Sequence, residues 1–79
     1  MNHYRRLRDL REDNDLTQTD ICELLNMKQS QYSRYERGIR DIPTDMLILL
    51  ADYYHVSTDY ILGLTDVTDP YPPSRRRKL

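Results

Sequence analysis

The sequence contains no tryptophan, no phenylalanine, one cysteine and two glycines among its 79 residues. The single cysteine, Cys22, cannot form an internal disulfide, which favours a reducing, cytoplasmic setting. Two histidines and one cysteine are too few and too scattered for a zinc site. The longest apolar run, Met46 to Ala51, has six residues, whereas a membrane-spanning helix needs about 20. We therefore expect no metal, no cofactor and no membrane-spanning segment.

The short chain also limits the class of function. A chain of 79 residues forms one domain at most, and a domain of this size buries only about 60–65% of its unfolded surface. The sequence has no recognisable nucleophile–base pair, metal cluster or phosphate-binding loop. A large enzyme with a deep substrate cleft is excluded, and we expect that the protein is not an enzyme.

The formal net charge of −1 hides an uneven distribution of charge along the chain. Residues 1–40 carry eight basic and seven acidic residues, residues 41–69 carry six aspartates and no lysine or arginine, and residues 70–79 carry four basic residues and no acid. A strongly basic protein would suggest nucleic-acid binding at once, but here any basic surface must be local. The best candidate is the stretch 28–40, where one acid faces four basic residues: Lys28, Arg34, Arg37 and Arg40.

Apolar residues recur at helical spacing in five short segments, and no segment shows the strict alternation of a half-buried strand. The spacing and the end signals predict helices over residues 2–14, from Thr17 to Asn26, over 28–37, from Pro43 to Tyr54 and from Ser57 to Gly63. The sequence therefore predicts an all-α protein with five short helices.

Small polar residues mark the expected helix ends. Thr17 can cap the second helix, with Asp20 three residues later as a weaker form of the capping box. Asn26 falls where a chain reversal needs a positive φ, and Gly38 lies where glycine commonly follows a helix end. These signals predict a tight turn between the second and third helices.

The expected core is built from aliphatic residues and tyrosines. Ile21, Leu24 and Leu25 form the apolar face of the second helix, with Cys22 beside them as a small residue. The seven tyrosines could form a platform on which nucleic-acid bases stack. Their spacing instead favours core positions for four of them, Tyr32, Tyr35, Tyr54 and Tyr60.

Residues 17–37 have the layout of a helix-turn-helix, in which two short helices are joined by a tight turn. The major groove of DNA is about 12 Å wide and accepts one α-helix. The inserted helix needs an apolar protein side, which Tyr32 and Tyr35 supply in the segment 28–37. Its outward side chains can read base edges, since glutamine pairs with adenine and arginine with guanine.

Several stretches of the chain agree in order and spacing with one family. They are Leu-Thr-Gln-Thr-Asp-Ile-Cys-Glu-Leu-Leu at 16–25, Ser-Arg-Tyr-Glu-Arg-Gly at 33–38, Ile-Pro at 42–43, Leu-Ala-Asp-Tyr-Tyr at 50–54 and Val-Ser-Thr-Asp-Tyr-Ile-Leu-Gly at 56–63. Over about residues 4–63 the chain resembles the Cro/repressor-type helix-turn-helix regulators of bacteria and their phages. Cys22 stands where alanine is usual in that family, and Asn26 where glycine is usual.

The resemblance implies a compact, five-helix, lambda-repressor-like bundle over residues 1–65. The change in composition to Thr, Asp and Pro after Gly63 predicts a flexible Pro/Arg-rich tail over 66–79. The resemblance also implies roles for single residues. The base-reading positions are occupied by Gln29, Ser30 and Arg34. Ser33, which can face outward on the same helix, is a further candidate for a base contact. The phosphate-contacting positions are occupied by Thr17, Gln18, Lys28, Arg37 and Arg40. Arg11 and Glu36 match a pair that links the first and third helices through a salt bridge.

Two functions of different classes remain open from the sequence. The first is a sequence-specific DNA-binding transcriptional regulator, which binds double-stranded operator DNA as a homodimer through residues around Asp59 to Leu64. A repressor is favoured over an activator, and the sequence leaves that choice open. The alternative is an antitoxin or anti-regulator that uses the same fold as a protein-interaction module. The acidic stretch 41–69 and the basic tail would suit such a module.

Overall fold

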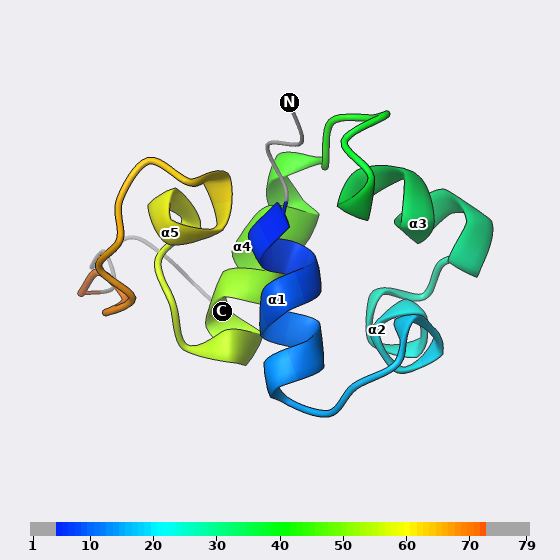
Figure 1. The fold of residues 1–79 in the computed structure, drawn as a ribbon, viewed down its shortest axis with the longest axis horizontal. Coiled ribbons are helices and arrows are strands. Elements are labelled where there is room, and N and C mark those ends of the chain that lie inside the picture. Colours follow the sequence, from blue (N-terminus) through cyan, green and yellow to red (C-terminus); the bar gives the residue numbers. More distant parts are fainter. Residues whose placement is uncertain (1–4, 73–79) are drawn as a thin grey trace.

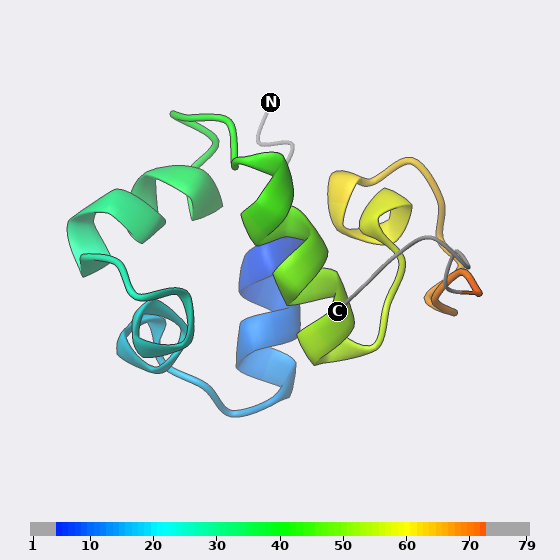
Figure 2. The same cartoon turned by 180° about the vertical axis from the view of Figure 1, so that it is seen from behind.

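The computed structural model describes residues 5–72, and five helices account for its regular secondary structure over that range. They are α1 (Arg5–Asp13), α2 (Gln18–Leu25), α3 (Gln29–Glu36), α4 (Thr44–Tyr54) and α5 (Thr58–Leu62). In the two opposite views, α1 and α4 occupy the middle, with α2 and α3 on one side and α5 on the other (Figure 1 and Figure 2). The prediction of an all-α, five-helix bundle is confirmed.

The turn between α2 and α3 is built by the residues that the sequence singled out. The Thr17 hydroxyl accepts a hydrogen bond from the Asp20 backbone N–H, while an Asp20 carboxylate oxygen accepts one from the Thr17 N–H at 2.8 Å. These bonds to Thr17 lower the pKa of Asp20. Asn26 ends α2 with a φ of 54°, the left-handed conformation that a short reversal requires. The predicted capping box and the positive φ are therefore confirmed.

Every helix contributes to one core. The largest fully buried side chains are one from each helix, in chain order Leu7, Ile21, Tyr32, Leu50 and Ile61. Because each helix places an apolar residue at this common centre, none of the five can leave without opening the core. The core thereby fixes α3 relative to the rest of the domain.

The expected apolar face of α2 needs a correction. Leu24 is 38% exposed, whereas Ile21, Cys22 and Leu25 are buried. At about 100° per residue these three span one sector of the helix, and Leu24 falls at its edge. Tyr32 and Tyr35 are buried as predicted, while Tyr54 and Tyr60 pack against the core from its edge and stay partly exposed.

Arg6 joins the beginning of α1 to the chain that leaves α5. Its guanidinium lies 4.1 Å from the centre of the Tyr60 ring and donates hydrogen bonds to the backbone oxygens of Tyr60 and Thr65. It also forms an ion pair with Asp66 at 2.6 Å. One side chain therefore satisfies two backbone carbonyls and one carboxylate from the segment 60–66.

The segment expected to be a flexible tail begins with residues that contact the helices. Residues 66–72 have no helix or strand, yet the Ser57 N–H donates to the Thr68 carbonyl oxygen at 3.2 Å. The Tyr71 hydroxyl donates to the Asp59 carboxylate. This part of the predicted tail therefore lies against α5, because its own polar groups find partners there. The remaining tail residues, 73–79, lie outside the described residues.

We predict that Arg6→Ala lowers the free energy of unfolding by about 1–3 kcal/mol, because it removes charged hydrogen bonds and a contact with an aromatic ring. Urea denaturation measures this loss. Hydrogen exchange at the Ser57 amide should also become faster, since the segment that covers it is released. Arg5→Ala is the matched control, because the exposed Arg5–Asp9 pair, 4.0 Å apart, contributes little. Equal losses for both variants would contradict the role of Arg6.

Candidate nucleic-acid interface

The outward side of α3 carries the side chains expected to read bases. Tyr32, Tyr35 and Glu36 are buried on the inner side of this helix. Gln29, Ser30 and Arg34 are exposed, and the side chain of Ser33 is half-buried. With 3.6 residues per turn, Gln29 and Arg34 are separated by about 140° around the axis, and Ser30 lies between them. The structure therefore places these three residues on one accessible half of the helix.

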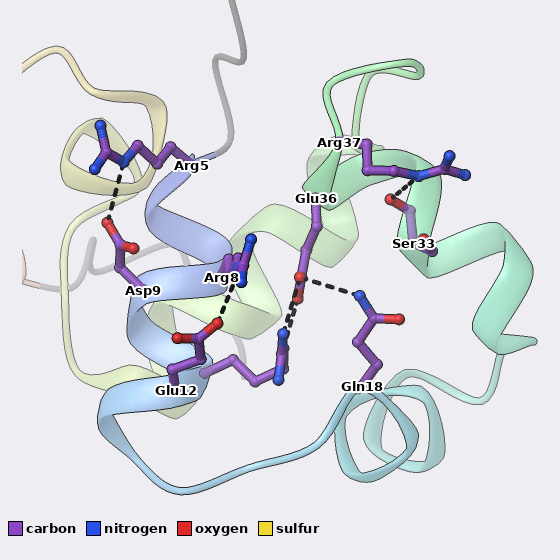
Figure 3. Close-up of a pocket in the computed structure, with 9 residues that line it drawn as sticks. Arg5, Arg8, Asp9, Glu12, Gln18, Ser33, Glu36 and Arg37 are labelled. Atoms are coloured by element: carbon purple, nitrogen blue, oxygen red, sulfur yellow. Dashed lines mark hydrogen bonds and ion pairs between the residues drawn. The ribbon is translucent and has the colours of Figure 1, made fainter.

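A chain of side-chain hydrogen bonds connects α3 to α2 and α1. Gln29 Nε2 donates to Gln18 Oε1 at 3.3 Å, and Gln18 Nε2 donates to Glu36 Oε1 at 3.2 Å. Arg11 Nε donates to Glu36 Oε2 at 2.8 Å, and a second guanidinium nitrogen reaches the other oxygen at 3.2 Å. In Figure 3 the Gln18 amide faces the Glu36 carboxylate across the space between their helices.

These bonds leave defined groups free on the two glutamines. Each glutamine amide has two N–H donors and one carbonyl acceptor. Gln29 uses one donor on Gln18 and keeps its oxygen and its second donor, which are the groups that a bidentate contact to adenine requires. Gln18 uses its oxygen and one donor, so one N–H remains for an external acceptor. The network thus orients both side chains before any ligand arrives.

Arg11 and Glu36 form the most buried ion pair among residues 5–72, with 13% and 4% of their side chains exposed. Arg11 also donates to the Leu16 carbonyl oxygen at 2.9 Å, which ties the α1–α2 loop to the same group. The hydrogen bond to Glu36 raises the pKa of Arg11. The guanidinium of Arg11 therefore binds groups of the protein itself and is not available to a ligand.

Paired and unpaired cations are segregated in the structure. All four arginines of α1 form ion pairs, with Asp9, Asp66, Glu12 and Glu36. The four basic residues in and beside α3 form none with any carboxylate of residues 5–72: they are Lys28, Arg34, Arg37 and Arg40. Of these, Arg37 donates only to the Ser33 carbonyl oxygen, at 3.4 Å (Figure 3). The uncompensated positive charge therefore surrounds α3.

One exposed polar side chain on α3 was not among the predicted site residues. Gln31 is exposed and lies on the side of the helix that faces Arg40. Its amide approaches the Tyr35 hydroxyl at 3.5 Å. Its polar character and its position three residues before Arg34 were visible in the sequence. The position of Arg40 beside it depends on the path of the following loop, which no spacing rule specifies.

Other classes of site find no support in the described part of the chain. Within residues 5–72, no group of three or more potential metal-ligating side chains gathers at one place. None of the helices in that range is both long enough and apolar enough to span a bilayer.

Two packed helices joined by a tight turn, with the polar side of the second exposed, define a helix-turn-helix protein. Residues 7–61 match the family described as helix-turn-helix, and the chain belongs to that family. The family resemblance inferred from the sequence is thereby confirmed.

Two of the relatives come from Bacillus subtilis strain 168. The uncharacterized HTH-type transcriptional regulator YobD is 44% identical over 77 residues, which cover 98% of this chain and 67% of YobD. The HTH-type transcriptional regulator ImmR is 42% identical over 64 residues, which cover 81% of this chain and 50% of ImmR. The antitoxin PezA of Streptococcus pneumoniae serotype 4 is 27% identical, over 81% of this chain and 40% of PezA. The matched region thus spans two thirds of YobD and half or less of ImmR and PezA.

We predict that Glu36→Ala lowers the free energy of unfolding by about 3–5 kcal/mol, because it leaves the Arg11 charge buried without a carboxylate to balance it. Arg11→Ala should cost a similar amount, and the double variant should cost less than the sum. Urea denaturation of the four proteins measures this coupling. The exposed Arg8–Glu12 pair, 67% and 52% exposed, is the control cycle and should show coupling under about 1 kcal/mol. Additive losses at Arg11 and Glu36 would contradict the buried pair.

Two tyrosines beside this network make stability depend on alkaline pH. Burial, followed by the negative charge of Glu36, raises the pKa of Tyr32 and of Tyr54 above the ordinary value of about 10. Above that pH the unfolded chain loses these protons while the folded protein keeps them. The stability present below pH 10 therefore falls by about 1.4 kcal/mol per pH unit for each tyrosine as pH rises.

We predict that the double variant Tyr32→Phe, Tyr54→Phe loses stability less steeply than the wild type between pH 10 and 11.5. Urea midpoints measured across that range test the slope. Tyr53→Phe is the control, because Tyr53 is 46% exposed, and it should stay close to the wild-type slope. If the double variant also keeps that slope, the two hydroxyls titrate equally in the folded and unfolded states.

Proposed function

We propose that this protein is a sequence-specific DNA-binding transcriptional regulator, a repressor, that inserts α3 into the major groove of double-stranded DNA. One observation carries the proposal: the unpaired cations of the described residues surround α3, while every arginine of α1 is neutralised. Phosphates attract uncompensated cations. The family and the names of YobD and ImmR support the same function. Binding to bacterial or phage DNA would take place in the cytoplasm.

Base reading is assigned to the exposed half of α3. Gln29 keeps one donor and one acceptor for adenine, and Arg34 keeps its guanidinium donors for guanine. Ser30 lies between them and can donate to or accept from a base edge. Ser33 is assigned to the edge of the same contact because its side chain is half-buried.

Phosphate contacts are assigned to the residues that flank the reading side. Thr17 and Gln18 lie at the beginning of α2, and the spare N–H of Gln18 is oriented by Glu36 and Gln29. Lys28 immediately precedes α3, and Arg37 and Arg40 follow it. Such contacts position the protein on DNA and carry no sequence information of their own.

A homodimer is proposed from the size of the domain. Its longest extent is 36 Å, so one copy covers one half-site, and half-sites are about 34 Å apart. The end of α5 suits the contact between copies, because Leu64 just after it is 74% exposed, and α5 lies on the opposite side of α1 and α4 from α3 (Figure 1). A bound dimer can act as a repressor because it excludes other proteins from the site that it occupies.

Selection of binding sites from a randomised duplex pool tests the proposed function. For the selected site we predict that Gln29→Ala and Arg34→Ala each weaken binding by about 1–3 kcal/mol, because each removes a bidentate contact. On random duplex DNA the two variants should lose much less. Arg8→Ala is the matched control, because its guanidinium already pairs with Glu12 at 2.5 Å.

Two outcomes would contradict the proposed function. Recovery of no enriched sequence would remove sequence-specific recognition. Equal losses on selected and random DNA would show that α3 contacts only the backbone. Absence of duplex affinity, together with recovery of one stoichiometric protein partner, would favour the antitoxin or anti-regulator alternative.

A further inference from the structure

Two large apolar side chains are exposed side by side on α4. Leu49 is 41% exposed and Tyr53 is 46% exposed. They are four residues apart, so they are neighbours on one face of the helix. The buried residues of α4, which are Leu47, Leu50 and Ala51, lie toward the opposite side and belong to the core. The outward side of α4 therefore carries apolar surface that the core does not use.

Acidic side chains flank these two residues. Asp45 and Asp52 are exposed, and at about 100° per residue both lie within about 60° of Leu49 around the helix axis. Residues 41–69, which include α4 and α5, contain six aspartates and no lysine or arginine. We call this surface the α4 face; it consists of Asp45, Leu49, Asp52 and Tyr53. A segment that covers it well needs positive charge together with apolar surface.

The described chain ends at the edge of the α4 face. A pocket of about 220 Å³ lies between α4 and the segment 70–72, with Ile48 and Asp52 on its α4 side. The two hydrogen bonds that join residues 66–72 to the beginning of α5 hold this segment in place. The rest of the chain therefore continues from a point beside α4.

That remainder, residues 73–79, lies outside the described residues, and its composition complements the α4 face. It contains three arginines, one lysine and one leucine, and no acid. Arginine and lysine lay their aliphatic stems on apolar surface while their charged ends reach carboxylates. A guanidinium also stacks favourably on a tyrosine ring such as that of Tyr53. The segment therefore supplies both kinds of contact that the α4 face offers.

The length of this segment also suits the α4 face. An extended chain of seven residues spans about 23 Å, and the eleven residues of α4 rise about 16 Å. The segment can therefore reach the whole face. Tethering gives it an effective concentration on the order of millimolar, so individually weak contacts suffice. The surface proposed for DNA lies at α3, on the other side of α1 and α4 from α5 (Figure 1 and Figure 2).

We propose that the α4 face is the docking surface for the basic end of the same chain, residues 73–79. The charged ends of residues 75–78 meet the two aspartates, and their aliphatic stems cover Leu49 and Tyr53. This contact closes the acidic side of the domain to other protein chains. The inference goes beyond the proposed function and does not rest on DNA binding, because the α4 face includes none of the residues assigned to DNA.

Paramagnetic relaxation in the full chain tests the docking. A nitroxide is attached to the variant Leu79→Cys, in the Cys22→Ala background that leaves a single thiol. At low salt it should remove most of the amide signal intensity of Leu49 and Tyr53, and much less of that of Ser30 on α3. In about 1 M salt, where the Debye length is about 3 Å, the broadening at α4 should fall at least about twofold.

Two charge variants of the labelled protein show what holds the segment. The double variant Asp45→Asn, Asp52→Asn should lose the broadening at Leu49 and Tyr53 already at low salt, because the attracting charges are gone. Asp9→Asn is the matched control, since Asp9 is an exposed aspartate of α1 outside the α4 face, and it should keep the broadening. Unchanged amide spectra away from the substituted residues show that each variant keeps its fold.

Three outcomes would overturn the proposal. Broadening that falls on α3, or on no amide of residues 5–72, would show that the segment does not dock on α4. Broadening that survives in the double aspartate variant would show that charge does not hold it there. A mixture of nitroxide-labelled protein with unlabelled, nitrogen-15-enriched protein separates the two possible sources of the segment. Broadening of α4 signals in that mixture would assign the contact to a second copy in place of the same chain.

Discussion

The buried carboxylate of Glu36 is the group on which the arrangement of the reading helix depends. It lies at the last residue of α3, where the helix dipole disfavours negative charge, and burial disfavours it further. It persists because Arg11 contributes two hydrogen bonds and Gln18 a third. Those donors come from α1 and α2, so the partners that stabilise one charge also fix three helices relative to each other. Gln29 joins the same chain of bonds and is thereby oriented from inside the domain.

The same pairing determines where positive charge is available to a ligand. Arg11 forms an ion pair with Glu36, and the other arginines of α1 pair with other carboxylates. The α1 helix therefore presents little positive charge to a ligand. The cations around α3 lack such partners, and a chain with a net charge of −1 can still offer a local basic surface. Total charge was therefore a poor guide to the ligand. The distribution of ion pairs, which requires coordinates, was the informative quantity.

Features that depend on neighbouring residues could be predicted from the sequence, whereas features that depend on contacts between distant segments could not. Helix ends were predictable because Thr17, Asn26 and Gly63 act on backbone groups within a few residues of themselves. The exposure of Leu24 was not, because periodicity finds an apolar sector but the neighbouring helices decide its edges. Two hydrogen bonds were also not predicted, because they join separate segments of the chain. They are the bond between Gln18 and Gln29 and the bond from Arg6 to the Thr65 carbonyl oxygen. The Arg11–Glu36 pair could be expected only from the family resemblance, since no spacing rule brings those residues together.

Through these contacts α1 connects the segment after α5 to the end of α3. Arg6 holds the segment after α5, and Arg11 holds the end of α3, so one helix anchors both sides of the bundle. The two arginines are about 140° apart around α1, which lets each reach a different neighbour. A second copy or a following domain could displace the segment after α5. Such a displacement would act on α1 through Arg6, and on α3 only through α1. In the proposed dimer, a contact through the end of α5 would therefore be connected to the reading helix through α1, which need not touch DNA.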